Sequence, residues 1–301
     1  MLSMNGSTVL HPNQPSQAPY LPAQPSLPMR ASVNTLLPSA LVQYGDGSFS
    51  TGFFARETLT LTPSNIVTDF WFGCGEGYGG DFGDTAGLFG LGRGKVSLVS
   101  QVAEKYGGVF SYCLPTRSSS NGYLTIGAGV QISPNVKFTQ MITKSYAPSF
   151  YFMELIGMSV GGKDLSIPST VFTNVGTIID SGTTITWLPP PAYSALSLEF
   201  RQHMSHYSLV TRLGELDTCY DFTGYSRIRV PAIALQFSGG VTLSVDASGI
   251  LLFASPSQGC LAFASNNKDV FSIVGNMQQR TFDVVYDIAR EMIGFGTGGC
   301  S

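Results

Sequence analysis

The residues around one carboxylate of the chain are of types that can hold an acid in a fixed position. Asp180 follows the β-branched run Thr177-Ile178-Ile179 and begins a tight turn of small residues. β-branched residues favour pleated strands, and glycine lets the backbone turn sharply. Turn amides and hydroxyls can hydrogen-bond an ionised carboxylate, which is otherwise expensive to bury. We therefore interpret Asp180 as a carboxylate that its own turn holds rigidly in place. The residues that support its turn are Ser181, Gly182, Thr183 and Thr184.

The alternative is a plain surface turn, because Asp, Ser and Gly dominate turns for purely local reasons. The flanking residues argue against this alternative. Apolar strand residues lie on both sides of the turn, and the pair Thr183-Thr184 follows the glycine, which a solvent loop does not need.

The segment Ile178–Thr184 resembles the second catalytic motif of the pepsin-like aspartic proteases, in their plant, nepenthesin-like branch. The resemblance runs from about Tyr44 to Ser301 and includes further motifs in the same order. These are Tyr44–Ser48, Phe72–Gly75, Ala86–Gly94, Phe110–Leu114, Ile273–Asn276 and Gly299–Ser301. In this family the apolar-apolar-Gly element, here Ile273-Val274-Gly275, packs against the Asp-Ser-Gly turn.

The resemblance implies a mainly β fold, namely the bilobal pepsin-like acid protease fold with an incomplete N-terminal lobe and a few short helices. We expect residues 1–40 to form a Pro-rich, mostly disordered tail, because they hold seven of the 17 prolines. Residues 41–148 would form the incomplete N-terminal lobe with its flap, and residues 149–301 the C-terminal lobe. In the second lobe, the prolines 189–191 predict a helix start, and the spacing of Tyr193, Leu196, Phe200 and Met204 predicts one apolar helix face.

Two β-rich runs flank Gly45-Asp46-Gly47-Ser48, which is a hairpin signal. The resemblance implies that this hairpin is the flap and that Tyr44, with Gly45, Asp46 and Gly47, covers substrate in the cleft. The alternative is that Tyr44 is a hairpin aromatic packed on a neighbouring strand.

Pepsin-like hydrolysis needs two Asp carboxylates that share one proton. Residues 1–45 contain no acid, and the earliest carboxylate is Asp46. We interpret Asp84-Thr85-Ala86-Gly87 as a loop, because Ala86 stands where the motif requires glycine. The simplest account is a chain that lacks the first strands of its N-terminal lobe and therefore also lacks the first Asp-Thr-Gly motif. We therefore expect an aspartic-type endopeptidase by family that is inactive or impaired as this chain. The alternatives are a non-catalytic binding or inhibitor protein on the protease fold, or two chains that each supply one Asp180.

The composition and net charge of the chain limit the classes of molecule that it could bind. The chain has 301 residues, of which 12% are charged, with a net charge of −3 and no basic block. These values argue against nucleic acid or an anionic membrane as the main partner, and no apolar run approaches the roughly 18 residues of a membrane span. We expect a monomer that meets a polypeptide substrate or protein partner, with no cofactor and no metal. The resemblance implies an extracellular or vacuolar compartment, but no signal peptide is visible, so the compartment stays open.

The chain has five cysteines, an odd number. The resemblance implies disulfides, with Cys219 and Cys260 as the preferred pair. A bond between Cys113 and Cys300 is the weaker expectation, and Cys74 would then have no partner. The alternative is that all five are reduced thiols of a cytosolic protein.

Overall fold

The computed structural model of the protein describes residues 39–45, 47–80, 82, 87–117, 119–266 and 270–300. Nearly all of the predicted Pro-rich tail, the flap residue Asp46 and the loop Asp84-Thr85-Ala86 lie outside the described residues. The described chain is mainly β, as the resemblance implied. It divides into two compact units, residues 1–105 and 106–301. The predicted lobes, divided at residue 148, stay a prediction.

The first unit contains a three-stranded antiparallel sheet in the order β1-β2-β3. Its strands are β1 (Ser39–Gln43), β2 (Phe49–Thr62) and β3 (Asn65–Gly79). The predicted hairpin is present, because β1 and β2 pair on either side of a turn that two bonds close: the Tyr44 amide donates to the Ser48 carbonyl at 2.8 Å, and the Gly47 amide to the Tyr44 carbonyl at 3.0 Å. Two short helices follow, α1 (Leu98–Gln101) and α2 (Ala103–Tyr106), the latter ending at the start of the second unit. The Gln101 amide ties α1 to β3 by bonding both backbone groups of Trp71 at 2.7 and 2.8 Å.

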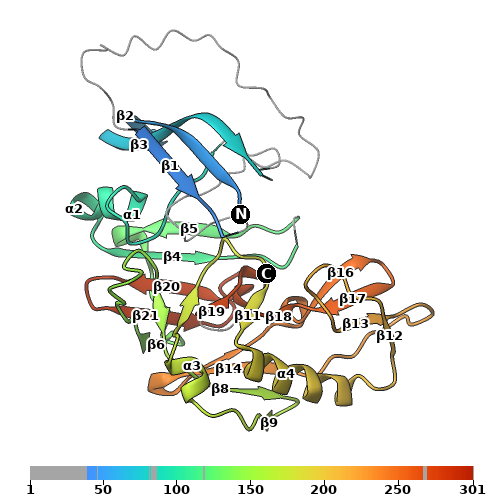
Figure 1. The fold of residues 1–301 in the computed structure, drawn as a ribbon. Helices are drawn as coiled ribbons and strands as arrows, with labels where there is room; N and C mark the ends of the chain where they lie inside the picture. Colours follow the sequence, from blue (N-terminus) through green and yellow to red (C-terminus); the bar gives the residue numbers. More distant parts are fainter. Residues whose placement is uncertain are drawn as a thin grey trace. The chain divides into compact units, whose positions relative to one another are not determined.

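The second unit contains two five-stranded sheets (Figure 1). The first is antiparallel, in the order β5-β4-β20-β21-β6. The second is mixed, in the order β18-β11-β19-β10-β7, with β10 parallel to β19 and β11 parallel to β18. The strands of the first are β4 (Val109–Cys113), β5 (Tyr123–Ile126), β6 (Lys137–Gln140), β20 (Asp283–Asp287) and β21 (Met292–Gly296). Those of the second are β7 (Phe152–Met153), β10 (Thr177–Ile179), β11 (Thr186–Leu188), β18 (Phe263–Ser265) and β19 (Ser272–Val274).

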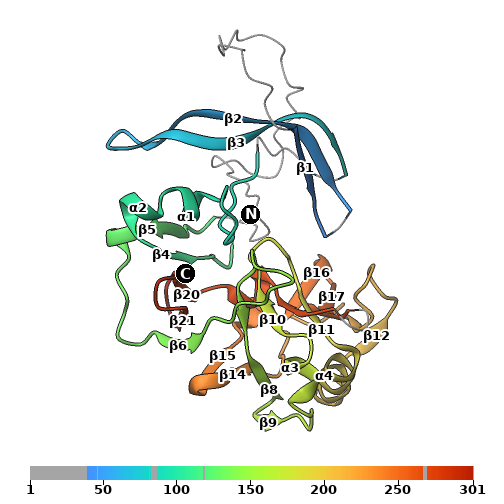
Figure 2. The same ribbon diagram turned by 60° about the vertical axis from the view of Figure 1, so that its left-hand side comes forward.

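Two four-stranded sheets complete this unit, in the orders β15-β14-β8-β9 and β12-β13-β17-β16. Their strands are β8 (Leu155–Val160), β9 (Lys163–Asp164), β12 (Ser208–Val210), β13 (Cys219–Asp221), β14 (Ile233–Phe237), β15 (Val241–Ser244), β16 (Leu251–Ser255) and β17 (Gln258–Leu261). Two α-helices, α3 (Thr170–Thr173) and α4 (Pro190–His203), lie beside β8 (Figure 2). Short 3-10 turns join the strands: η1 (Gly127–Gly129), η2 (Ser238–Gly240), η3 (Ala247–Gly249) and η4 (Asn276–Gln279).

The helix predicted from the three prolines is α4. Proline suits the first helical position because its missing N–H has no acceptor there in any case. The residues predicted to form its apolar face, Tyr193, Leu196, Phe200 and Met204, are all buried. Their burial confirms the predicted face, which packs towards β8, β11 and β18.

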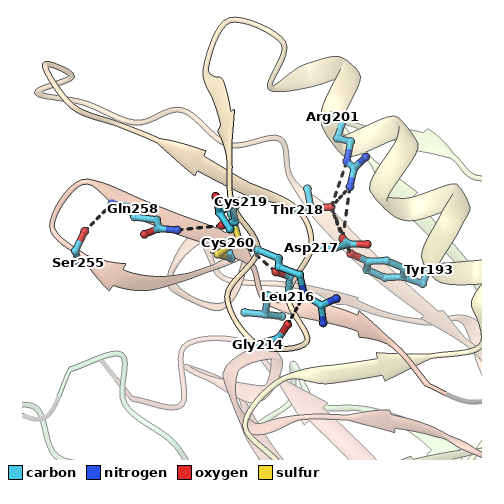
Figure 3. The surroundings of a disulfide bond; sticks show 12 residues. Tyr193, Arg201, Gly214, Leu216, Asp217, Thr218, Cys219, Ser255, Gln258 and Cys260 are labelled. Carbon is cyan, nitrogen blue, oxygen red and sulfur yellow. Dashed lines mark hydrogen bonds and ion pairs between the residues drawn. A yellow bond between two sulfur atoms is a disulfide. The ribbon is translucent and has the colours of Figure 1, made fainter.

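Both implied disulfides are present, and Cys74 is the free cysteine among the described residues. Cys219 and Cys260 lie directly opposite each other on the antiparallel strands β13 and β17. Just before Cys219, the Thr218 hydroxyl accepts a bond from the Arg201 guanidinium at 2.8 Å and donates to the Asp217 carboxylate at 2.8 Å (Figure 3). These contacts fasten the chain ahead of the disulfide to α4.

No helix in the described ranges has both the length and the apolar character needed to cross a membrane.

Candidate active site

Asp180 directly follows β10, which lies between β19 and β7 in the mixed sheet. The strand pairs in parallel with β19, and the Asp180 amide continues this ladder by donating to the Val274 carbonyl at 3.1 Å. All three residues of β10 are buried, and Asp180 itself is 1% exposed. The β-branched run therefore delivers the acid from a buried strand, as the sequence predicted.

Donors from the following turn reach both carboxylate oxygens. The Gly182 amide donates to Oδ1 at 2.9 Å, and the Thr183 hydroxyl donates to Oδ2 at 2.8 Å. Hydrogen bonds to an ionised acceptor are stronger than neutral ones, and they offset part of the cost of removing a carboxylate from water. Gly182 and Thr183 thus make direct contacts with the acid.

The other two predicted support residues lie differently. Ser181 is buried, and its carbonyl accepts a bond from the Asn276 side chain at 3.2 Å. Thr184 is exposed, and its carbonyl accepts the Met277 amide at 3.1 Å. Both residues join the turn to the segment that follows β19.

The apolar-apolar-Gly element runs from the end of β19 into that segment, and it lies against the Asp180 turn as the family resemblance implied. The Asn276 amide donates to the Thr183 carbonyl at 2.7 Å, and the Gly275 amide donates to the Thr186 hydroxyl at 3.1 Å. A β-carbon on Gly275 would lie 2.3 Å from the Ile185 carbonyl oxygen, closer than a real β-carbon tolerates. Glycine is required here because two backbone segments approach each other too closely for a side chain.

Sequence reasoning missed two glutamines that are 0% exposed, Gln278 and Gln279. The Gln278 amide accepts from the Thr186 hydroxyl at 2.8 Å and donates to the Gly249 and Ala262 carbonyls at 2.7 and 3.1 Å. Buried amides are tolerated when their donors and acceptors are paired. The available signal was position, since both glutamines come within four residues after the element that packs on the turn.

Sequence reasoning also missed a buried tyrosine pair next to the site. Tyr112 of β4 donates its hydroxyl proton to Gln279 Oε1, and its oxygen lies 3.2 Å from that of Tyr286 on β20. Tyr286 stacks on Phe110 with ring centroids 4.4 Å apart. Burial raises the pKa of Tyr112 far above its usual range, and the nearby charge of Asp180 raises this pKa further. Both phenols therefore stay protonated in the folded protein.

The predicted flap residues lie in the other unit. Tyr44, Gly45 and Gly47 form the β1–β2 turn, where the Tyr44 ring meets the ring of Phe82 edge-on at 5.6 Å between centroids. The function of this hairpin as a flap stays a prediction. Over the described ranges, His, Cys, Asp and Glu side chains form no group of three or more that could hold a metal ion.

Two family models match the chain. Residues 150–297 match the model described as "Xylanase inhibitor C-terminal", and residues 32–128 match "Xylanase inhibitor N-terminal". An aspartyl protease family protein of Arabidopsis thaliana is 48% identical over 261 residues, which cover 86% of this chain and 55% of the relative. The aspartic proteinase nepenthesin-2 of Nepenthes gracilis is 38% identical over 270 residues, covering 85% and 60% of the two chains. The chain thus spans a little over half the length of these relatives.

Solved structures support the fold. The basic 7S globulin from soybean superimposes with a TM-score of 0.73 at 20% sequence identity, covering 99% of this chain and 88% of the globulin. Conglutin gamma from lupine seeds gives a TM-score of 0.69 at 18% identity, covering 86% and 72% of the two chains. At these identities the likeness concerns the fold alone.

Proposed function

Because the chain belongs to the plant branch of the pepsin-like aspartic protease family, we propose that it provides the Asp-Ser-Gly half of an acid protease active site. Asp180 is the catalytic carboxylate of this half. The observation that carries the proposal is the buried Asp180 carboxylate, which receives one hydrogen bond on each oxygen from its own turn. A carboxylate held so rigidly suits a reaction in which a water and a carbonyl must meet it in a fixed geometry.

Asp180 alone cannot perform the reaction of this family. In pepsin-like hydrolysis one carboxylate acts as general base on a shared water, and a second, protonated carboxyl group polarises the scissile carbonyl. The 301-residue sequence contains one Asp-Ser-Gly motif and no Asp-Thr-Gly motif. We therefore propose that this chain by itself hydrolyses peptides weakly or not at all, and that a second motif from a longer protein would complete the site.

A protease assay on four proteins tests this proposal. The substrate is an unfolded protein at about pH 4, where a pair of Asp carboxyl groups can share one proton. The proteins are the chain alone, a fusion that adds an N-terminal segment carrying an Asp-Thr-Gly motif, and this fusion with either Asp180→Asn or Asp164→Asn. Asp164 is an exposed acid on β9 and serves as the matched control.

We expect peptide release from the fusion and from its Asp164→Asn variant, but not from the chain alone or from the Asp180→Asn variant. Release by the chain alone would contradict the proposed incompleteness. Release by the fusion that survives Asp180→Asn would contradict the catalytic role of Asp180.

The second candidate function is a non-catalytic binding protein on the protease fold. Its support is that both matching family models carry the description of a xylanase inhibitor. Titration of the chain with a purified xylanase, followed by calorimetry, separates the two functions. Binding that is unchanged by Asp180→Asn, together with an inactive fusion, would favour this second function.

A further inference from the structure

A ring of hydrogen bonds passes through Asp180 and through side chains from two other parts of the chain. The Val274 carbonyl accepts two bonds, from the Asp180 amide at 3.1 Å and from Gln279 Nε2 at 2.8 Å. On its other side the Gln279 amide accepts a bond from Tyr112. The ring thus connects the residue after β10 with η4 and β4, through positions 180, 279 and 112 of the sequence.

The direction of each bond in the ring is fixed. A backbone carbonyl can only accept, so the NH₂ group of Gln279 must face Val274, and its Oε1 must face Tyr112. The Tyr112 hydroxyl must therefore donate its single proton to Gln279. Its oxygen is then left to accept bonds, and the Tyr286 hydroxyl at 3.2 Å is in place to donate one.

The ring returns to Asp180 through the next residue. A hydrogen bond from the Ser181 side chain lowers the pKa of Tyr112, as a bond donated to the phenol oxygen does, and so opposes the larger effect of burial. Ser181 directly follows Asp180, so the backbone between these two residues closes the ring at the catalytic turn. Asp180 and Ser181 are each 1% exposed, and Tyr112 and Gln279 are 0% exposed.

Packing alone does not require these polar groups. A phenylalanine and a methionine would fill similar volumes, whereas a buried phenol and a buried amide are unfavourable unless they are hydrogen-bonded. The strand that carries Tyr112 is also fixed covalently, because the next residue, Cys113, is bonded to Cys300. The ring therefore connects the Asp180 turn to a well-anchored strand of the neighbouring sheet.

We propose that Tyr112 and Gln279 are positioning residues for Asp180, which hold the Asp180-Ser181 backbone at a fixed height and orientation above the antiparallel sheet. The proposal rests on the proposed role of Asp180, but it concerns the geometry of the free protein. It assigns neither side chain a direct contact with the reacting atoms.

Amide hydrogen exchange of the purified chain, followed by NMR, tests this proposal without any substrate. The amides to follow are those of Asp180 and Gly182, which are bonded to Val274 and to the carboxylate. The variant Tyr112→Phe removes the hydrogen bond to Gln279 and keeps the aromatic side chain. The matched control Tyr286→Phe removes the same group from a buried tyrosine whose hydroxyl is bonded to Tyr112 and not to Gln279. Amides of β14, in another sheet, report on global opening.

We expect Tyr112→Phe to accelerate exchange at Asp180 and Gly182 by about tenfold relative to β14, as the loss of one buried hydrogen bond predicts. Gln279→Met should have a similar effect, and the double variant should be little worse than either single one, because both break the same ring. Tyr286→Phe should change the ratio by less than about threefold, since the bonds of Gln279 remain.

The proposal is wrong if Tyr112→Phe leaves the ratio unchanged, or if it accelerates β14 equally. It is also wrong if the two single effects add in the double variant. Should Gln279→Met fail to fold, Tyr112→Phe and its control decide the question alone. Because exchange is measured without substrate, its result is independent of whether Asp180 proves essential for hydrolysis.

Discussion

Replacing Thr183 by valine isolates one hydrogen bond to the buried carboxylate of Asp180. Valine has nearly the shape of threonine, so the change removes the bond from the hydroxyl to Oδ2 at 2.8 Å and leaves little cavity. Hydrogen bonds to charged groups contribute about 1.5 to 3 kcal/mol, and a buried acceptor left unpaired adds its desolvation cost. With Asp180 only 1% exposed, water cannot readily replace the lost donor. We therefore expect the free energy of unfolding to fall by about 2 kcal/mol.

The neighbouring residue provides a matched control. Thr184→Val makes the same chemical change at an exposed position that contributes its backbone carbonyl to the site. Surface substitutions of this kind usually change stability by less than about 0.5 kcal/mol. Urea unfolding at neutral pH, followed by far-ultraviolet circular dichroism, gives both values. Equal losses in the two variants, or a larger loss for Thr184→Val, would refute the assignment of Thr183 as a direct support of the carboxylate.

Three further changes have defined outcomes in the same unfolding assay. Gly275→Ala places a methyl group 2.3 Å from a backbone carbonyl oxygen, so we expect a loss of at least about 2 kcal/mol; a neutral result would show that this contact can relax. Replacing both Cys219 and Cys260 by alanine opens a loop with a sequence separation of 41, and the chain-entropy relation gives a loss of about 4 kcal/mol; an unchanged urea midpoint would contradict it. The Lys163 ammonium, 2.7 Å from Glu199, lowers the pKa of this carboxyl group. The pair therefore stabilises the folded state above the pKa that Glu199 has in the unfolded chain, and it loses this effect as pH falls through the lowered folded-state pKa. We expect Lys163→Met to lower the free energy of unfolding at neutral pH and to leave it nearly unchanged in strong acid. An equal loss of stability at both pH values would exclude the ion pair as its cause.

The turn that holds the Asp180 carboxylate could be predicted from the sequence because its chemistry is local. Asp180, Gly182 and Thr183 lie within four consecutive residues, and the donors that reach the carboxylate come from the turn itself. The helix α4 could be predicted for the same reason, since proline at its start and apolar residues at helical spacing are both short-range signals.

The buried ring could not be predicted in this way. Tyr112 and Gln279 are 167 positions apart, and only the pairing of β4 with β20 and of β10 with β19 brings them to the same place. A glutamine in a sequence normally indicates an exposed position. Two adjacent buried ones therefore resemble an ordinary polar loop until the strands around them are known.

The bond between Cys113 and Cys300 joins residues 187 positions apart and so makes nearly the whole second unit a covalent circle. A protease that nicks an exposed segment inside this circle, such as the one around Leu209, which is 56% exposed, would not release a fragment. The nicked molecule would keep its mass on a non-reducing gel and separate into pieces only after reduction. The fragment that carries Asp180 would thus remain tethered to the fragment that carries Gln279, and in an oxidising compartment the turn could outlast cuts in the loops around it.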